Sequence, residues 1–232
     1  MAPSTDQPEF DQFARNYESL FKPWLRIAGS SREHFARARI QWLAALLKER
    51  NVTARRVMDF GCGTGISIPL LLEILGAEEV IGVDPSRRSL DIAAETVANS
   101  KVRLLTPEEY KPRAELDLVF TNGVFHHIPL EERETSLAFV YDSLRPGGFF
   151  ALWENNPWNP IVLYSMKTTE LDKNAIPISP PRARQLARNK FTVVRTDHLF
   201  FFPAYLRILQ RLEKSMMKVP CGAQYQVLLQ KS

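Results

Sequence analysis

The chain has 232 residues, of which 45% are hydrophobic and 24% are charged, a balance typical of a soluble globular domain. No apolar stretch reaches the roughly 18 to 20 residues of a membrane span, and the first ten residues lack the basic end and apolar core of a secretory signal. Only Cys62 and Cys221 are cysteines, so we expect a reduced, cytoplasmic setting. No Cys/His cluster has the spacing of a zinc site, and we expect no bound metal.

The net charge of +4 is distributed unevenly. Residues 161–232 contain 12 Lys/Arg and 4 Asp/Glu, a charge of +8, whereas the first 160 residues contain 18 and 22, a charge of −4. Scattered charges of this kind are typical of a solvated surface, and the alternative is a C-terminal half that faces an anionic partner. Because the basic residues form no dense run, the pattern does not favour nucleic acid.

Apolar periodicity predicts alternating helices and strands over most of the chain. Spacings of three and four predict helices between residues 10 and 50. Short apolar runs then predict strands at 56–60, 80–84, 101–105, 116–122 and 149–155. The helices expected between them cover 67–76, 87–100 and 130–144, with Gly76 closing the first and the turn RPGG following the last.

After Trp158 the pattern loosens. Ser179 and the two prolines after it predict a helix over 179–190, followed by a strand at 191–202, an amphipathic helix at 204–218 and a strand at 223–231. This alternation predicts one α/β domain whose mostly parallel sheet is covered on both faces. Residues 1–50 form a helical cap, 51–155 the core, 156–180 an insertion or lid, and 181–232 the C-terminal completion.

The segment VMDFGCGTG follows the first predicted strand, at the sheet edge where ligands of such folds bind. A phosphate-cradling loop needs a Lys followed by Ser or Thr after its last glycine, and a dinucleotide fingerprint needs Gly or Ala where Ile66 stands. Asp59 would repel a pyrophosphate and suits a ligand with a positive charge. Asp84 ends the second strand, where an acid can accept both hydroxyls of a ribose. The pattern therefore predicts a nucleoside with a cationic tail.

With EVIGVDPS, DLVFTNGVFHHIP and SLRPGGFFALWE following in order, the chain resembles the class I S-adenosylmethionine-dependent methyltransferases of the small-molecule type. The resemblance is strongest over residues 10 to 155. It implies a Rossmann-like sheet of seven mostly parallel strands with helices on both faces and the last strand antiparallel. It also implies that S-adenosylmethionine is the methyl donor.

The resemblance implies a role for each matched residue. Gly61, Gly63 and Gly65 would line the methionine portion and the ribose, Asp59 would face the amino group, and Asp84 would bind the ribose hydroxyls. The other implied donor contacts are Cys62, Thr64, Pro85, Ser86, Glu108, Asn122 and Tyr17. The alternatives are that Asp59 and Asp84 cap helices, that Glu108 is a surface acid, and that Tyr17 packs on an amphipathic helix.

Two segments are candidates for the acceptor side. His126 and His127 follow the fourth strand, and either imidazole could act as a general base or be a structural histidine. WENNPWNP follows the fifth strand, and its side chains predict either a pocket wall or a proline-braced turn with a buried tryptophan. The candidate acceptor contacts there are Trp153, Glu154, Asn155 and Trp158. An Asn-Pro motif after the fifth strand, rather than after the fourth, argues against methylation of nucleic-acid bases.

The predicted helix at 204–218 is either core packing or a surface that meets a hydrophobic, lipid-linked or membrane partner. The function expected is methyl transfer to a small organic acceptor, at oxygen first and then at carbon or nitrogen. The rivals are an RNA or protein methyltransferase and a non-catalytic donor-binding subunit. The sequence leaves the oligomeric state open.

Overall fold

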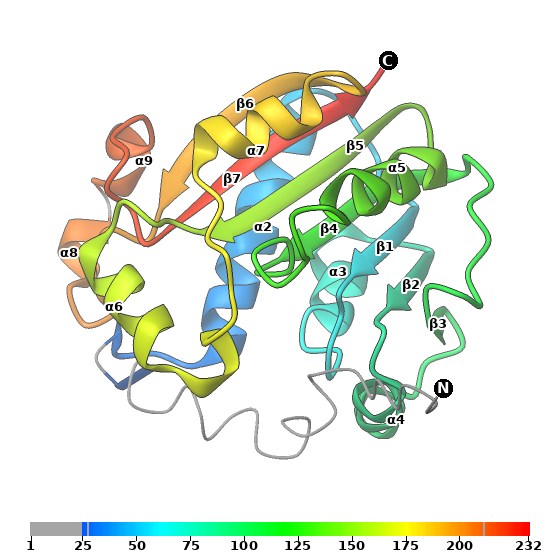
Figure 1. The fold of residues 1–232 in the computed structure, drawn as a ribbon, viewed down its shortest axis with the longest axis horizontal. Coiled ribbons are helices and arrows are strands. Elements are labelled where there is room, and N and C mark those ends of the chain that lie inside the picture. The colour runs from blue at the N-terminus through cyan, green and yellow to red at the C-terminus, as the bar shows by residue number, and fades with distance from the viewer. Residues whose placement is uncertain (1–24, 27, 211) are drawn as a thin grey trace.

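Seven strands within the described residues form one sheet in the order β3-β2-β1-β4-β5-β7-β6 (Figure 1). The computed structural model describes residues 25–26, 28–210 and 212–232, so the predicted donor contact Tyr17 lies outside the described residues. The strands are β1 Arg56–Phe60, β2 Glu79–Val83, β3 Val102–Leu105, β4 Leu116–Asn122, β5 Leu144–Asn155, β6 Phe191–Leu199 and β7 Gln224–Lys231. Neighbouring strands are parallel except that β7 runs antiparallel to both β5 and β6, which confirms the predicted fold class.

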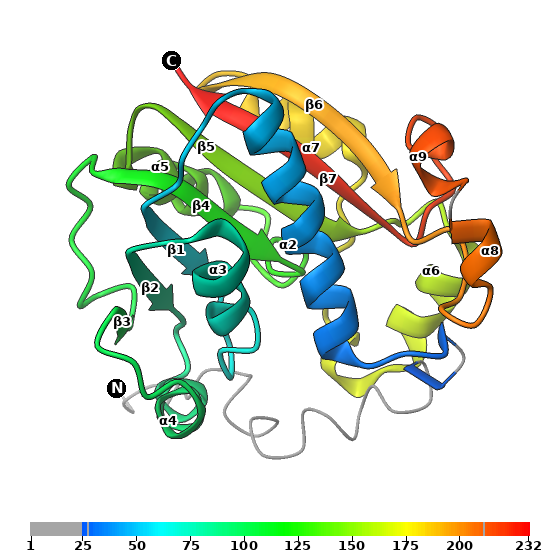
Figure 2. The same ribbon diagram turned by 180° about the vertical axis from the view of Figure 1, so that it is seen from behind.

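Helices cover both faces of the sheet. Helices α5 and α7 lie in front in Figure 1, whereas α2 and α3 lie in front in the reverse view of Figure 2. The helices are α2 Arg32–Glu49, α3 Ile68–Leu75, α4 Arg87–Thr96, α5 Arg133–Ser143, α6 Pro160–Thr168, the 3₁₀ helix η2 Glu170–Asp172, α7 Pro180–Ala187, α8 Arg207–Gln210 and α9 Glu213–Met216. No helix among the described residues is both long enough and apolar enough to cross a membrane.

Alternate residues of the central strands pack into two hydrophobic cores. Val57 of β1 belongs to the core under α2 and α3, and its neighbour Met58 belongs to the core under α5 and α7. In β4, Phe120 enters the first core and Val119 the second. A strand buried on both faces needs apolar residues at successive positions, which is why these strands appear in the sequence as continuous apolar runs.

The sheet order reverses at β1, which lies between β2 and β4. The aligned register pairs Phe60 of β1 with Val83 of β2, so the two strands end at the same edge. The loop after β1 is fixed there because the N–H groups of Gly61 and Cys62 both donate to the carbonyl of Val83, at 2.7 and 3.1 Å. This reversal point is where ligands of open α/β sheets bind.

Two predicted boundaries differ from the structure. β5 begins at Leu144 and continues through the predicted turn RPGG, where the β4–β5 register shifts between Leu116 and Leu118. The predicted strand at 191–202 ends at Leu199, because Phe200 takes a left-handed conformation with φ of 62°. The N–H groups of Phe200, Phe201 and Phe202 then bond to the carboxylate of Glu213 instead of to a neighbouring strand.

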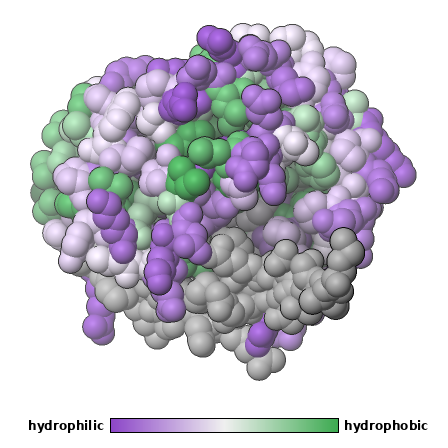
Figure 3. Space-filling view, viewed as in Figure 1, coloured by the Kyte–Doolittle hydropathy of each residue, from purple (hydrophilic) through white to green (hydrophobic). Residues whose placement is uncertain are grey.

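The amphipathic helix predicted at 204–218 is two short helices, α8 and α9. Glu213 begins α9 and is held by the three phenylalanine N–H groups, which fixes the chain direction at that point. Ile208 and Leu212 are largely exposed, and apolar surface is visible at the left edge of Figure 3, where α8 and α9 lie in Figure 1. Core packing therefore does not account for all of the apolar side chains of this segment.

Gly61 is the loop glycine with the least space around it. Its φ is +75°, and an added Cβ would lie 2.3 Å from Cγ2 of Val124. We expect Gly61→Ala to lower the free energy of unfolding by about 2–4 kcal/mol, from left-handed strain plus overpacking. Gly76→Ala is the matched control, since Gly76 has a φ of +67° with no atom within 4 Å of the added Cβ, and it should cost only about 1–2 kcal/mol. Urea unfolding of both variants measures the difference, and equal losses would contradict it.

Candidate active site

A cavity of about 560 Å³ opens at the carboxyl ends of β1, β2 and β4. This volume lies in the usual range for sites of small ligands and cofactors. Its walls come from the loop after β1, the start of the segments after β2 and β3, the turn after β4 and the first half of α5. The predicted site residues that line it are Asp59, Gly61, Cys62, Gly63, Thr64, Asp84, Pro85, Glu108, Asn122 and His127.

Asp59 is almost completely buried in this wall. Burial, together with repulsion from Asp84, raises the pKa of its carboxyl to about 7, and the positive charge of Arg39 opposes the shift. Arg39 lies on α2 and donates to Oε1 of Gln224 at 2.9 Å. A buried carboxylate that is costly to ionise is stabilised by a cation from outside, so this wall suits a ligand with a positive charge.

Asp84 links the glycine loop to the end of β2. Its Oδ2 accepts the N–H of Gly63 at 2.8 Å and its Oδ1 accepts the N–H of Ser86 at 2.9 Å. A carboxylate has about four lone-pair positions, so two backbone bonds leave capacity for further donors such as a pair of hydroxyls. The capping alternative and the ligand-binding prediction for Asp84 are therefore compatible.

Asn122 ends β4 at the same wall of the cavity. Its Oδ1 is buried and has no hydrogen-bond partner within the described part of the chain. A buried acceptor without a donor is costly, and a bound donor group would remove that cost. Asp59 lines the same cavity, so its walls offer two acceptor groups that suit an ammonium group.

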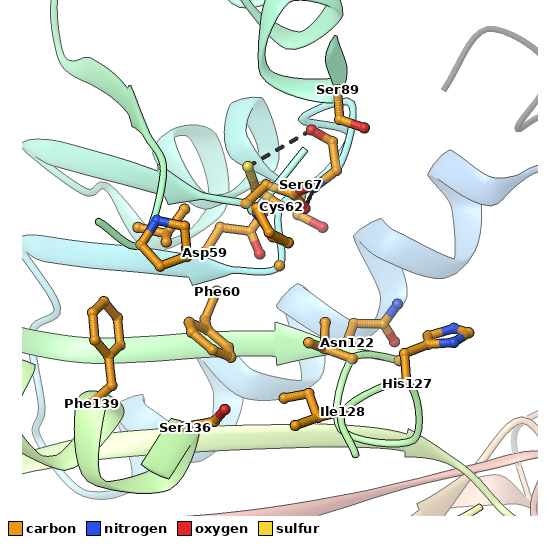
Figure 4. A pocket seen from close by; sticks show the side chains of 18 of the residues that line it. Asp59, Phe60, Cys62, Ser67, Ser89, Asn122, His127, Ile128, Ser136 and Phe139 are labelled. Atoms are coloured by element: carbon orange, nitrogen blue, oxygen red, sulfur yellow. Dashed lines mark hydrogen bonds between the residues drawn. The ribbon is translucent and has the colours of Figure 1, made fainter. Parts of the chain in front are cut away.

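The side of the cavity across from the glycine loop carries several apolar side chains beside the polar residues of α5. Figure 4 shows Ile128 and Phe139 across from Asp59 and Cys62, with the ring of Phe60 directed from β1 toward Phe139, 5.8 Å between ring centroids. Gly63 faces the open space between these walls, since an added Cβ there would meet no atom within 4 Å. The arrangement suits a ligand with a flat apolar part, a polyhydroxyl part and a cationic end.

Two of the predicted donor contacts that the structure describes do not reach the cavity wall. Ser86 is fully buried as the N-cap of α4, where its Oγ accepts the N–H of Ser89 at 3.1 Å. Gly65 packs on α4, and an added Cβ would lie 3.0 Å from Cβ of Ala93. Tyr17 lies outside the described residues.

The two predicted base candidates have different surroundings. His126 is buried behind the cavity, and its Nδ1 lies 2.5 Å from Oε2 of Glu154. Burial lowers the pKa of His126, but the charges of Glu154 and Asp172 outweigh that effect and raise it to about 9. His127 lines the cavity, and its Nε2 lies 3.4 Å from Oδ1 of Asp172.

None of the four predicted acceptor contacts lines the cavity. Trp153 and Glu154 have no exposed surface, and a fully buried side chain cannot touch an acceptor. Asn155 accepts a hydrogen bond from Gln224 at 3.0 Å, and Trp158 is half exposed outside the cavity. In the structure Trp153 is buried within β5, and the turn that follows it lies outside the cavity wall.

Neighbouring asparagines brace this turn. Nδ2 of Asn156 donates to the carbonyls of Pro220 and Gly222, and Nδ2 of Asn159 donates to the carbonyl of Cys221. Asn159 also caps α6 by accepting from the N–H groups of Ile161 and Val162. These hydrogen bonds therefore hold the segment WENNPWNP, at the end of β5, against residues 220–222, which lie just before β7.

Sequence reasoning missed several residues of the site. Phe60 and Ile66 adjoin the glycine loop, and Arg32 comes from the start of α2. The α5 wall consists of Glu132, Thr135, Ser136 and Phe139. The place of α5 in the chain was an available signal for these residues, since a helix that follows β4 starts at the carboxyl edge of the sheet. Asp172 had no local signal, because only folding brings it to the histidines.

Comparison with known sequences gives matches to methyltransferases. Residues 57–148 match the family model described as "Methyltransferase domain". A protein of Azoarcus sp. named trans-aconitate 2-methyltransferase is 34% identical over 99 residues, which cover 43% of this chain and 38% of the relative. A protein of the same name from Pseudomonas paraeruginosa is 29% identical over 171 residues, 72% of this chain and 60% of the relative. The aligned parts thus span less than two thirds of the length of each of these two relatives.

The fold matches a solved structure over nearly its whole length. The crystal structure of a SAM-dependent methyltransferase from Archaeoglobus fulgidus superposes with a TM-score of 0.60 and 18% identity, covering 91% of this chain and 99% of that one. The sheet order, the matched family model and the carboxylates around the glycine loop agree with one another. On these grounds residues 57–148 are similar to the methyltransferase domain of that family model, and the chain shares its fold with the solved S-adenosylmethionine-dependent methyltransferase.

Proposed function

We propose that the protein transfers a methyl group from S-adenosylmethionine to an oxygen atom of a small organic acceptor. The observation that carries the proposal is the convergence of Asp59, Asp84 and the glycine loop on one wall of a 560 Å³ cavity. Three further features each fit one part of that donor. They are the buried carboxylate of Asp59 with its raised pKa, the Asn122 oxygen that has no partner among the described residues, and the open space at Gly63.

When bound, the donor supplies a sulfonium carbon that is already activated for displacement. The protein's contribution is then to position the donor and the acceptor and to exclude water. Asp59 and Oδ1 of Asn122 would hold the ammonium group. Asp84 would hold the ribose hydroxyls with its remaining lone pairs, and Phe60 and Phe139 would enclose the apolar part.

His127 is the histidine placed to contact the acceptor, since it lines the cavity while His126 does not. An imidazole at that position can take the proton of an acceptor hydroxyl, provided that its Nε2 is not otherwise engaged. His126 is a positioning residue in this proposal. Its ring lies 4.2 Å from that of His127, and Glu154 fixes its orientation.

A small organic acid is the acceptor class that the surroundings favour. Trans-aconitate, which appears in the names of the matched relatives, is a tricarboxylate. In this chain, Arg32 contributes a cation to the cavity wall. A guanidinium group suits a carboxylate geometrically as well as by charge. A hydrophobic acceptor is a second candidate, favoured by the exposed apolar side chains of α6 and α8, among them Ile161, Tyr164 and Ile208.

The RNA alternative loses support because several basic C-terminal residues are engaged within the protein. Arg195 and Lys218 both bond to the buried carboxylate of Asp197. Lys231 donates to two backbone carbonyls and lies over the ring of Tyr141. Charges held in this way are less available to neutralise phosphates.

The proposal is tested first by calorimetry with S-adenosylmethionine and then by methyl transfer to a panel of acceptors. The panel contains trans-aconitate, simple hydroxy acids, a phenol, a prenylated alcohol and bulk tRNA. We expect donor binding and transfer to an organic acid. Failure of donor binding would refute the proposal, and transfer to tRNA alone would replace it with the RNA alternative. Donor binding without transfer to any acceptor would favour the non-catalytic subunit.

Asp84→Ala should weaken donor binding about 5- to 150-fold, the equivalent of about 1–3 kcal/mol for lost hydrogen bonds to buried hydroxyls. The matched control is Asp91→Ala, which removes an exposed acid of α4 outside the cavity. Calorimetry on both variants, with thermal unfolding to confirm that each is folded, makes the comparison. Equal donor affinities in the two variants would show that Asp84 does not hold the ribose.

Asp59→Asn should have opposite effects on stability and on binding. A folded pKa of about 7 lies above the ordinary 3.8, so the carboxyl's contribution to stability is full below pH 4 and is lost as the pH rises to 7. At pH 8 the ligand-free variant should therefore be more stable than the native protein by about 1–3 kcal/mol, and at pH 4 nearly equal to it. Urea unfolding at the two pH values checks this, and a pH-independent difference would contradict it.

The same substitution should lower donor affinity at pH 8, because the ammonium group loses its carboxylate partner. Native affinity should fall as the pH drops below 7, since protonated Asp59 has no charge, and the variant should lack this dependence. Calorimetry over pH 5.5 to 8.5 provides the measurement, with Asp91→Asn as the control. Parallel pH profiles for the native protein and Asp59→Asn would contradict the assignment.

A further inference from the structure

Two histidines and a carboxylate meet beside the cavity, although the sequence separates them. His126 and His127 lie in the turn after β4, and Asp172 lies in η2. One ligand atom of each lies within 4.8 Å of the other two. All three side chains are buried or nearly so, so this group is not a chance surface cluster.

The spacing of these atoms suits a single cation. Oδ1 of Asp172 lies 3.4 Å from Nε2 of His127 and 3.7 Å from Nε2 of His126. Two ligands of one tetrahedral centre, each about 2.0–2.2 Å from the metal, lie about 3.3–3.6 Å apart. The two measured separations from Asp172 are within about 0.1 Å of this range.

The outer surroundings of the cluster are also those of a metal site. Glu154 holds Nδ1 of His126 at 2.5 Å, which leaves Nε2 to face the cluster. Its other oxygen accepts the N–H of Phe125 at 2.8 Å, so the carboxylate itself is fixed. Histidine ligands of metals usually donate their second ring nitrogen to such a carboxylate, which sets the tautomer and the ring orientation.

The charges around the cluster leave room for a cation. Glu154 and Asp172 place two carboxylates in a buried region. The guanidinium of nearby Arg133 donates to the carbonyls of Ile128 and Ile176, and its charge offsets part of that of Glu154. A metal cation would offset the remaining negative charge in place of a proton on His126.

We propose that His126, His127 and Asp172 bind one divalent transition-metal cation at the acceptor end of the cavity. Imidazole with carboxylate favours ions such as zinc, and three protein ligands leave a coordination position open. This replaces our expectation from the sequence that no metal is bound. The sequence offered only the adjacent histidines, and the carboxylate that completes the set is far away in the chain.

The open position gives the cation a role that rests on the proposed methyl transfer. His127 belongs to both the cluster and the cavity wall, so a cation on its Nε2 borders the acceptor space. There it would hold an acceptor oxygen and make its hydroxyl proton easier to remove. Metal binding and proton abstraction from the acceptor would both use Nε2 of His127. The carboxylate of Asp172 beside that nitrogen favours metal binding.

The test is titration of the metal-free full chain with Zn²⁺ alone, followed by calorimetry and by thermal unfolding. The protein carries Cys221→Ser throughout, because that exposed thiol could bind zinc by itself. We expect one equivalent to bind and the unfolding temperature to rise. Asp172→Asn and His127→Gln should each weaken zinc binding at least tenfold, and Glu154→Gln about 10- to 100-fold through His126.

Matched controls separate this site from surface binding. Glu170→Gln changes an exposed acid in the same short helix, and His34→Ala removes an exposed histidine, and neither should alter zinc binding. S-adenosylmethionine binding, measured on Asp172→Asn and Glu154→Gln, should remain, so loss of the metal site is distinguishable from failure of the donor proposal. Absence of zinc binding in the parent protein, or unchanged zinc affinity in both Asp172→Asn and His127→Gln, would overturn the proposal. Loss of affinity in His34→Ala instead would assign the zinc to the surface.

Discussion

The site depends on how the loop after β1 is fastened to the end of β2. The carbonyl of Val83 accepts two N–H groups of this loop, and the carboxylate of Asp84 accepts a third from Gly63. These bonds turn the chain away from the sheet and direct it into α3, which leaves a concave wall of backbone. Because the glycines carry no side chains, a ligand can approach that wall closely. The cavity exists because two neighbouring strands end at the same level and are joined there.

The same fastening concentrates negative charge. Asp59 and Asp84 end adjacent strands, so their carboxylates repel each other across the wall, and the burial of Asp59 adds to the cost of ionising it. The ligand-free protein therefore carries an unfavourable electrostatic arrangement that a cationic ligand relieves. Repulsion at the site lowers the stability of the ligand-free protein, and binding of a cationic ligand offsets that loss. The affinity therefore depends on the charge of the ligand.

The cavity wall around the glycine loop was largely predictable from the sequence, and the wall across from it was not. Asp59, Gly63 and Asp84 are set by the ends of strands, and strand ends can be located from apolar runs and glycines. WENNPWNP could be read as a pocket wall or as a braced turn, because its asparagines bond to residues 220–222, which no local pattern reveals. The helix expected at 204–218 differed for a similar reason: a single carboxylate, that of Glu213, redirects the chain by binding three N–H groups.

The insertion between β5 and α7 is attached to the core by a few specific bonds. The N–H of Ile176 donates to the carbonyl of His126, and the hydroxyl of Tyr225 donates to the carbonyl of Ile178. The donor wall, by contrast, uses residues that precede Ser143 in the chain. Among the described residues, a substitution in this segment can therefore act on the cavity only indirectly, through bonds such as these, whereas a substitution before Ser143 can change a lining side chain itself.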